Sequence, residues 1–273
     1  VVPIDCVDFS PFSICNNNLE EIVFHNEFLY MDDMCFVECF KLKSIHLPKS
    51  LMCIGEYPLD ISGLEKITID TENKKYIVKN NSLLTFDGTE LIAIPPGLKD
   101  ELYEIPDGVR KAEEYLPGNS YIKKLFIPNT IPSFTAYAFC KGNSMMSSFS
   151  SLIECIVKDD NPYFVSVDGV LYSKDLKKLI YYPNYRKGEE YTLIDSCISF
   201  EISALINPSY LKRIYISNQS FNLVSIEEVI SVGMDDDKDI DFYIKNDQEY
   251  DLVDFDKLDI ELLMKKYNEI EEN

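Results

Sequence analysis

The sequence has few of the residues and motifs that enzymes use for catalysis. His25 and His46 are its only histidines, and it contains no glycine-rich phosphate loop, GxSxG turn or HExxH helix. It has no CxxC pair, and the closest cysteines, Cys35 and Cys39, lack the second pair or the nearby histidines that a zinc site requires. We therefore expect a protein that is not an enzyme and that uses no cofactor and no metal.

Positive charge and long apolar stretches are also scarce. The chain of 273 residues has 26 basic and 47 acidic side chains, a formal net charge of -21. This excess of negative charge repels phosphate groups, so nucleic acid is not an expected partner. No run of about 18 apolar residues occurs, so we expect no membrane insertion. The first residue is Val1 rather than Met, which we interpret as the removal of an upstream signal peptide or tag.

Internal repetition is the main feature that the sequence does contain. Residues 64–105 align without a gap on residues 152–193, at an offset of 152 − 64 = 88. The matching pairs include Leu64/Leu152, Asn73/Asn161, Leu83/Leu171, Asp87/Asp175, Pro95/Pro183 and Tyr103/Tyr191. Repetition at this length is typical of a repeat array.

A shorter period lies within the long one. The pattern apolar-x-x-apolar-x-apolar starts at Leu19, Leu42 and Leu64, at intervals of 42 − 19 = 23 and 64 − 42 = 22, and it returns later in the chain. Alternation at the end of each copy predicts a short strand with one buried face. We expect one parallel sheet built from residues 22–24, 45–47, 67–69, 103–105, 125–127, 155–157, 191–193 and 214–216.

Two of the gaps between copies are longer and hold an insertion. Alternating apolar residues flank Asp87-Gly88 in the first gap and Lys174-Asp175 in the second. Asp-Gly accepts the backbone angles of a tight turn, so we predict inserted β-hairpins near residues 83–95 and 170–183.

These motifs resemble the BspA-like leucine-rich repeats. The resemblance rests on residues 35–55, 127–142 and above all 161–183, and it covers roughly residues 19–217. It implies a leucine-rich-repeat solenoid that is mainly β, with irregular or short helical turns, a parallel sheet on one face and inserted β-hairpins. Ile61, Asn119 and Pro208 depart from the pattern, since they stand where Cys39 stands in its repeat.

The repeat pattern divides the chain into three parts. We expect an N-terminal cap in residues 1–18, the solenoid in residues 19–217, and a divergent last repeat with an acidic, helical C-terminal cap in residues 218–273. The cap is predicted from apolar residues near helical spacing between Asp256 and Ile270, with Asp256 available to cap the first turn.

One face of the predicted sheet is the candidate binding surface. Its outward row is Val23, His46, Thr68, Glu104, Phe126, Ile156, Thr192 and Tyr215, extended by Tyr243. Large side chains such as Phe126, Ile156, Tyr215 and Tyr243 typically anchor interfaces. Lys124, Lys158 and Arg213 add positive charge that could steer an acidic or sugar-bearing partner. The alternative is that these side chains pack against the inserted hairpins or the C-terminal cap.

The resemblance implies adhesion or recognition of a partner outside the cell, and we expect a monomer that binds a protein or glycan. A secreted or cell-surface location follows from the same resemblance. The eight cysteines favour a cytoplasmic alternative, because Cys39 and Cys155 fall on core positions where reduced thiols act as small apolar groups. Two other functions stay open, namely a carbohydrate-binding accessory protein or enzyme with a concave pocket, and an intracellular scaffold.

Overall fold

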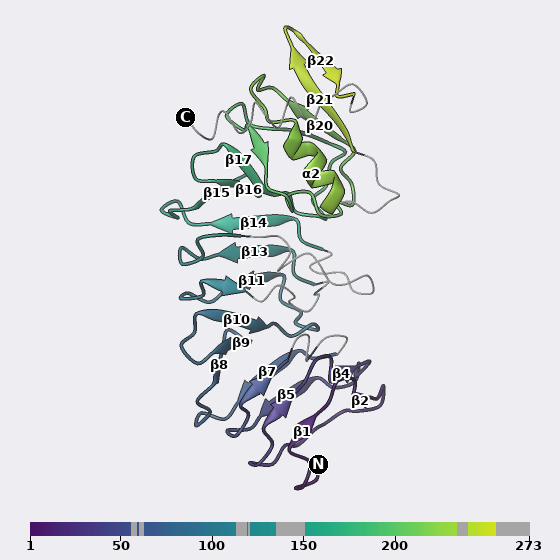
Figure 1. The fold of residues 1–273 in the computed structure, drawn as a ribbon, viewed down its shortest axis with the longest axis vertical. Helices are drawn as coiled ribbons and strands as arrows, with labels where there is room; N and C mark the ends of the chain where they lie inside the picture. The colour runs from purple at the N-terminus through teal and green to yellow at the C-terminus, as the bar shows by residue number, and fades with distance from the viewer. Residues whose placement is uncertain are drawn as a thin grey trace. The chain divides into compact units, whose positions relative to one another are not determined.

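The computed structural model describes residues 1–55, 59, 63–112, 119, 121–134, 151–233 and 240–254 (Figure 1). The chain divides into two compact units, which we call unit 1 (mainly Val1–Ser133) and unit 2 (mainly Ile153–Asn273), and each is described by itself. The regular elements of the described residues are β-strands and one helix. Among them, no helix has the length and apolar character needed to cross a membrane.

Unit 1 is built from short strands. They are β1 (Asp8–Phe9), β2 (Ile14–Cys15), β3 (Tyr30–Met31), β4 (Phe36–Val37), β5 (Ser44–Leu47), β6 (Cys53–Ile54), β7 (Lys66–Ile69), β8 (Tyr76–Lys79), β9 (Ser82–Thr85), β10 (Glu90–Ala93), β11 (Leu102–Glu104), β12 (Lys111–Ala112) and β13 (Lys124–Ile127). Each of these strands consists of two to four residues, which is the length that the apolar-x-x-apolar-x-apolar pattern allows.

Parallel strands in unit 1 pair at the period read from the sequence. β5 pairs with β7 through Ser44↔Lys66 and β11 pairs with β13 through Leu102↔Lys124, both at the interval that separates Leu42 from Leu64. On other sides of the repeats, β1, β3 and β6 form a three-stranded parallel sheet and β2 pairs with β4. Each repeat therefore lies beside the one before it, and the pairing already includes strands within residues 1–18.

Unit 2 repeats this organisation and adds a helix. Its elements are β14 (Glu154–Val157), β15 (Phe164–Val167), β16 (Val170–Ser173), β17 (Lys178–Tyr181), β18 (Glu190–Thr192), β19 (Ser199–Phe200), β20 (Arg213–Ile216), α2 (Val224–Gly233), β21 (Asp241–Asn246) and β22 (Glu249–Leu252). β18, β20, β21 and β22 form one sheet in that order, parallel except for the antiparallel pair β21–β22.

Helix α2 was not anticipated from the sequence. Asn222 begins it, because its side-chain oxygen accepts a hydrogen bond from the N–H of Val224 at 3.1 Å. Ile226 and Val229 point into the core of unit 2, where Phe200, Phe221 and Phe242 also lie. The helix occupies the connection between β20 and β21, and it lengthens that step beyond the period of the other parallel pairs.

Antiparallel strands lie at both predicted insertions. β9 pairs with β10 across the Asp87-Gly88 turn, and β16 pairs with β17 across the turn that holds Asp175. Each hairpin also has a preceding strand, so β8–β9–β10 and β15–β16–β17 are three-stranded meanders. The first turn of each meander is a two-residue turn with positive φ, at Asn80-Asn81 and at Asp168-Gly169.

Two expectations need correction, and a third falls outside the described residues. The repeat strands do not form one parallel sheet, because β5–β7, β11–β13 and β18–β20 belong to three separate sheets. Residues 22–24 form no strand, because the one backbone hydrogen bond found there is from Val2 N to Val23 O at 2.9 Å, which is too little for a ladder. Ile22 and Phe24 still pack against the core of unit 1. The helical cap predicted over 256–270 lies outside the described residues.

Buried amide side chains connect successive repeats in unit 1. The side-chain N–H groups of Asn73 donate to the carbonyl oxygens of Pro48 and Leu51 in the preceding repeat, at 3.1 and 3.0 Å. Its oxygen accepts the backbone N–H groups of Lys75 and Tyr76. Asn73 is 2% exposed, so these bonds satisfy backbone groups that water does not reach.

Asn119, which departs from the sequence pattern, acts in the same way as Asn73. It donates to the carbonyl oxygens of Pro95 and Leu98 and accepts the N–H groups of Tyr121 and Ile122. At the corresponding position in an earlier repeat, the thiol of Cys39 donates to the carbonyl oxygen of Ile14 at 3.7 Å. Asn119 therefore keeps a contact with the preceding repeat, although its residue type differs from the sequence pattern.

Truncation of a strand residue tests the packing of both units. Ile67 and Ile214 are 1% and 0% exposed. We expect Ile67→Ala and Ile214→Ala each to lower the free energy of unfolding by about 2–5 kcal/mol, because each leaves a cavity in a core. Denaturant titration followed by circular dichroism measures this. A loss below about 1 kcal/mol at both sites would contradict the burial of these side chains.

Removal of a buried amide tests the connection between repeats. We expect Asn73→Ala to lower the free energy of unfolding by more than about 2 kcal/mol, since it leaves several buried backbone groups without partners. The exposed Asn17 provides the matched control, and Asn17→Ala is expected to change stability by less than about 0.5 kcal/mol. Equal losses in the two variants, measured by the same titration, would show that the amide bonds between repeats contribute little.

Candidate interaction surface

The strongest candidate surface lies on the sheet β18–β20–β21–β22 of unit 2. Thr192, Tyr215, Tyr243 and Leu252 form a register row across the four strands. Alternate residues on the same strands, such as Ile214 and Phe242, are fully buried. Because side chains alternate between the two faces of a strand, the row projects from the outward face.

Three tyrosines meet on this face, and we call Tyr215, Tyr243 and Tyr250 the tyrosine cluster. The rings of Tyr215 and Tyr243 stack with centroids 5.2 Å apart and planes at 24°. Tyr250 meets Tyr215 edge-on at 5.2 Å, and its hydroxyl lies 2.9 Å from that of Ser217. Tyr215 and Tyr243 are half-buried, whereas Tyr250 and Leu252 are exposed.

The positive charge expected beside this surface is already paired with acidic side chains of the neighbouring strand. One nitrogen of Arg213 lies 2.6 Å from the carboxylate of Glu190 on the neighbouring strand. This hydrogen-bonded ion pair raises the pKa of Arg213 above its ordinary value. Lys212 pairs in the same way with Glu189 at 2.8 Å, which lowers the pKa of that carboxyl. Arg213 therefore holds β20 against β18 and offers little net charge to a partner.

The other residues predicted for the site lie on different strands. Lys124 and Phe126 are on β13 in unit 1, where Phe126 is half-buried opposite Glu104 and Lys124 is exposed opposite Leu102. Ile156 is half-buried on β14, and Lys158 is exposed just after that strand. β14 contacts β15 and β16, which do not belong to the sheet that carries the tyrosine cluster. The structure thus brings together Tyr215, Tyr243 and Arg213 from the predicted set.

Sequence reasoning missed Tyr250 and Leu252. Both lie on β22, which returns beside β21 after a turn in which Asp247 has a positive φ of 50°. The alternation of Tyr250 and Leu252 with Glu249 and Asp251 is a strand signal that could have revealed this hairpin.

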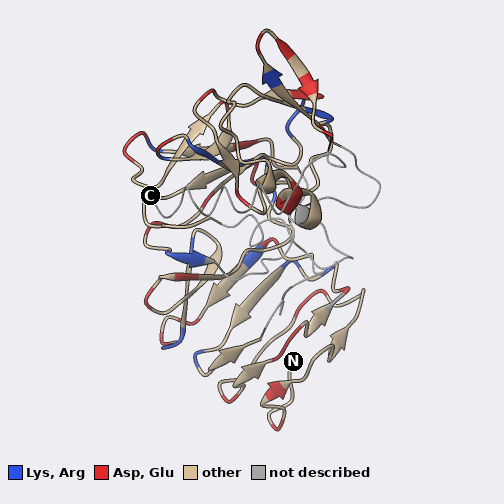
Figure 2. Ribbon diagram, turned by 45° about the horizontal axis from the view of Figure 1, so that its top comes forward, with Lys and Arg blue, Asp and Glu red and all other residues tan. Residues whose placement is uncertain are grey.

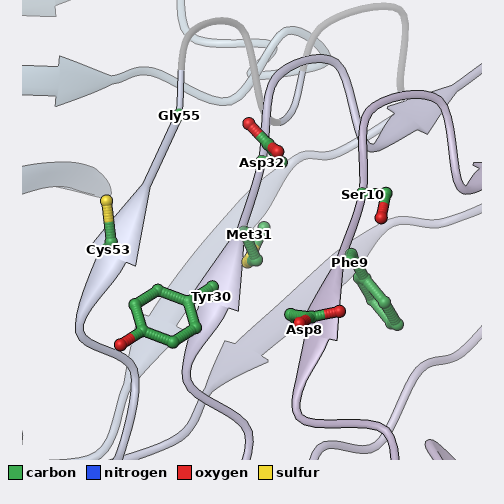
Figure 3. Close-up of a pocket in the computed structure, with 8 residues that line it drawn as sticks. All are labelled: Asp8, Phe9, Ser10, Tyr30, Met31, Asp32, Cys53 and Gly55. Carbon is green, nitrogen blue, oxygen red and sulfur yellow. The ribbon is translucent and has the colours of Figure 1, made fainter.

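Unit 1 contains a shallow hollow of about 350 Å³ on the sheet β1–β3–β6. Figure 3 shows Asp8, Tyr30 and Cys53 side by side on these strands, followed by Ser10, Asp32 and Gly55. Gly55 is required for close packing, because a Cβ atom there would lie 2.7 Å from the backbone nitrogen of Asp33. Two carboxylates and a phenol ring at one place can accept hydrogen bonds and contact an apolar surface.

The described residues hold neither a metal cluster nor a histidine–cysteine pair. They contain no group of three or more His, Cys, Asp or Glu side chains suited to a metal ion. His25 contacts the carbonyl oxygen of Cys6 at 3.0 Å, and His46 contacts the hydroxyl of Thr68 at 3.0 Å. Among the described residues, neither imidazole ring therefore makes a hydrogen bond to a thiol.

Comparisons with known proteins agree with the repeats seen in the sequence. Residues 7–100 match the BspA type leucine rich repeat region, in six copies. The match covers residues 7–100 only, and it agrees with the resemblance of the sequence motifs to the same family. No curated protein matches the chain.

Three solved structures are similar to this chain. The pneumococcal vaccine antigen PcpA is 18% identical with a TM-score of 0.54, over 87% of this chain and 59% of that one. A leucine-rich repeat protein from Eubacterium ventriosum is 15% identical, with a TM-score of 0.44 over 71% and 46% of the two chains. A leucine rich cell surface protein from Faecalibacterium prausnitzii is 16% identical, with a TM-score of 0.45 over 82% and 59%.

The PcpA comparison shows that this chain and PcpA share a fold. This chain spans roughly half to six tenths of the length of the three structures, from 46% to 59%. At these identities the comparison concerns the fold alone.

The cysteines provide a separate test of the core. Cys39 and Cys155 are 0% and 1% exposed, which agrees with their predicted core positions, and Cys35 and Cys197 are also buried. Burial raises the pKa of Cys35 to about 12 and that of Cys197 to about 11. A raised pKa leaves less of the reactive thiolate at neutral pH. Cys140 lies outside the described residues.

Alkylation should separate buried from exposed thiols. We expect iodoacetamide at about pH 8 to modify the exposed Cys53 in the folded protein, while the four buried cysteines react after unfolding in guanidinium. Mass spectrometry of tryptic peptides at successive times measures each site. Modification of Cys39 or Cys155 as fast as Cys53 would overturn the assignment of these thiols to the core.

Proposed function

We propose that this chain is a non-enzymatic interaction module that binds a protein partner through the tyrosine cluster of unit 2. BspA-type repeats suggest a protein-interaction or adhesion role, which supports the general class. We also propose that the parallel strands of each unit form a short stretch of leucine-rich-repeat solenoid, since β5–β7, β11–β13 and β18–β20 pair at the period of the sequence motifs. The C-terminal cap over residues 218–273 belongs to the same proposal.

The observation that carries the proposal is the packing of Tyr215, Tyr243 and Tyr250 on one outward face. Large aromatic side chains with a polar hydroxyl are typical anchors of interfaces. Because the three rings already contact one another, they lose little conformational freedom when a partner binds. Tyr215 also packs against the hairpin β21–β22, which lies within residues 218–273.

A second candidate function is supported by the hollow of unit 1. A sugar offers hydroxyl groups to carboxylates and an apolar ring face to an aromatic side chain. Asp8, Asp32 and Tyr30 supply these groups, and Tyr30 is 47% exposed. This arrangement favours glycan recognition there as the alternative to protein binding in unit 2.

One binding experiment separates the two functions. The wild-type chain is applied to an array of immobilised extracellular-matrix proteins and to an array of glycans. Every probe that binds is then measured by surface plasmon resonance against Tyr215→Ala/Tyr243→Ala, Tyr30→Ala/Asp32→Asn and Tyr163→Ala. Tyr163 is an exposed tyrosine of unit 2 outside the sheet and serves as the matched control.

We expect the unit 2 variant to weaken binding to a matrix protein by more than about 2 kcal/mol, roughly thirtyfold, and Tyr163→Ala to change it little. Loss of glycan binding in Tyr30→Ala/Asp32→Asn alone would support the second function instead. Thermal unfolding verifies that each variant is folded. Unchanged affinity in the folded unit 2 variant, or no bound probe on either array, would contradict the proposal.

A further inference from the structure

The strand β22 forms the outer edge of its sheet. In the order β18–β20–β21–β22, it has a neighbour on one side only among the described strands. Val253 N donates to Phe242 O at 2.8 Å, and the register Tyr243↔Leu252 continues from this pair. Hydrogen-bonded and non-hydrogen-bonded pairs alternate along antiparallel strands. Tyr250 and Leu252 are consequently in non-hydrogen-bonded pairs, and their backbone groups point away from β21.

These outward backbone groups are available for pairing. Within the part of the chain that the structure describes, no hydrogen bond reaches the backbone N–H or C=O of Tyr250 or Leu252. A row of such groups at a sheet edge is a template for another extended chain. Adding a strand to an exposed edge is also a recurring way in which proteins bind peptides.

The side chains on this edge favour a partner with apolar residues at alternate positions. Leu252 is 56% exposed and Tyr250 36% exposed, and both project on the same face as Tyr243. A chain lying beside β22 would place every second side chain next to them.

The charge around the edge selects the partner. The hairpin segment 241–254 carries five carboxylates and the single ammonium group of Lys245, a formal charge of 1 − 5 = −4. The carboxylates are those of Asp241, Asp247, Glu249, Asp251 and Asp254. Figure 2 shows acidic residues on both strands of this hairpin. Complementarity therefore favours a cationic chain.

A second copy of this protein fits the edge poorly. Pairing two β22 strands would bring two such segments together, and each whole chain carries a net charge of -21. Like charges placed opposite one another on neighbouring strands are destabilising.

We infer that β22 is a docking edge for an extended, lysine- or arginine-bearing peptide segment of a partner protein, which joins the sheet as a fifth strand with alternate apolar side chains against Tyr250 and Leu252. This inference rests on the proposed interaction role. It concerns the backbone groups at the edge of the sheet, whereas the proposed function concerns the side chains on its face. An experiment can therefore contradict either proposal without contradicting the other.

The probe is a fluorescein-labelled peptide of alternating lysine and valine, and its binding to the full chain is measured by fluorescence anisotropy. The main variant is Leu252→Pro. Proline is tolerated on an edge strand where the lost N–H faces outward, so the pair β21–β22 is retained while the docking edge is blocked. Tyr163→Ala, at an exposed tyrosine of unit 2 outside this sheet, leaves the edge unchanged and is the matched control.

We expect the peptide to bind the wild-type chain and Tyr163→Ala equally, and to bind Leu252→Pro at least about tenfold more weakly. A peptide of alternating glutamate and valine should not bind. Binding of the lysine peptide should weaken at about 1 M salt, where charges are screened beyond about 3 Å.

Two peptide analogues test strand addition without altering the protein. N-methyl groups on the odd or on the even residues remove alternate N–H donors, and only one of the two sets faces β22 in an added strand. We expect one analogue to lose binding and the other to keep it. Equal affinity of both analogues, equal binding to Leu252→Pro, or no binding to the wild-type chain would overturn the inference. Concentration-dependent dimerisation that Leu252→Pro abolishes, seen by sedimentation, would assign the edge to a second copy instead.

Discussion

A side-chain donor that reaches the carbonyl oxygens of the preceding repeat is the constraint on which the described repeats of unit 1 depend. Asn73 and Asn119 each donate to two or more carbonyl groups of the repeat before and accept two N–H groups of their own turn. Parallel strands of two to four residues make too few ladder bonds to stack by themselves. The amides satisfy the buried turns between these strands, so that the apolar residues of neighbouring repeats can close into one core.

The sequence predicts the features that depend on local pattern. Alternation around Asp87-Gly88 locates the first hairpin, and the period of the apolar motif gives the registers Ser44↔Lys66 and Leu102↔Lys124. The pattern at Leu19 looks the same, yet residues 22–24 form no strand. A strand requires a neighbour that supplies a ladder, and the chain beside Val23 provides a single hydrogen bond from Val2. The alternation of apolar and polar residues indicates which side chains are buried, but it does not indicate whether a partner strand is present.

The candidate surface could also be predicted only in part from the sequence. Alternation correctly places Tyr215 and Tyr243 on one face, because both follow buried residues on their strands. It cannot show that Arg213 is held by Glu190, since these residues lie 23 positions apart and meet only when β18 and β20 pair. For the same reason it overlooks Tyr250, which joins the cluster through the hairpin turn at Asp247. The two proposed surfaces thus share one sheet, with an aromatic face and an acidic edge.

The two copies of the repeat, 88 residues apart, also differ in the side chain that pairs with one buried tyrosine hydroxyl. The buried hydroxyl of Tyr103 lies 2.6 Å from that of Ser82, whereas the hydroxyl of the matching Tyr191 lies 2.8 Å from that of Tyr172. Position 170, the counterpart of Ser82, is Val170, and position 84, the counterpart of Tyr172, is Leu84.

The two copies therefore satisfy the same tyrosine hydroxyl from different positions on the adjoining strand. Exchanging Ser82 for valine first would leave the hydroxyl of Tyr103 buried without a partner, whereas gaining tyrosine at position 84 first would not. A change from the first arrangement to the second therefore has to add the tyrosine before it removes the serine, if the tyrosine hydroxyl is to keep a partner throughout.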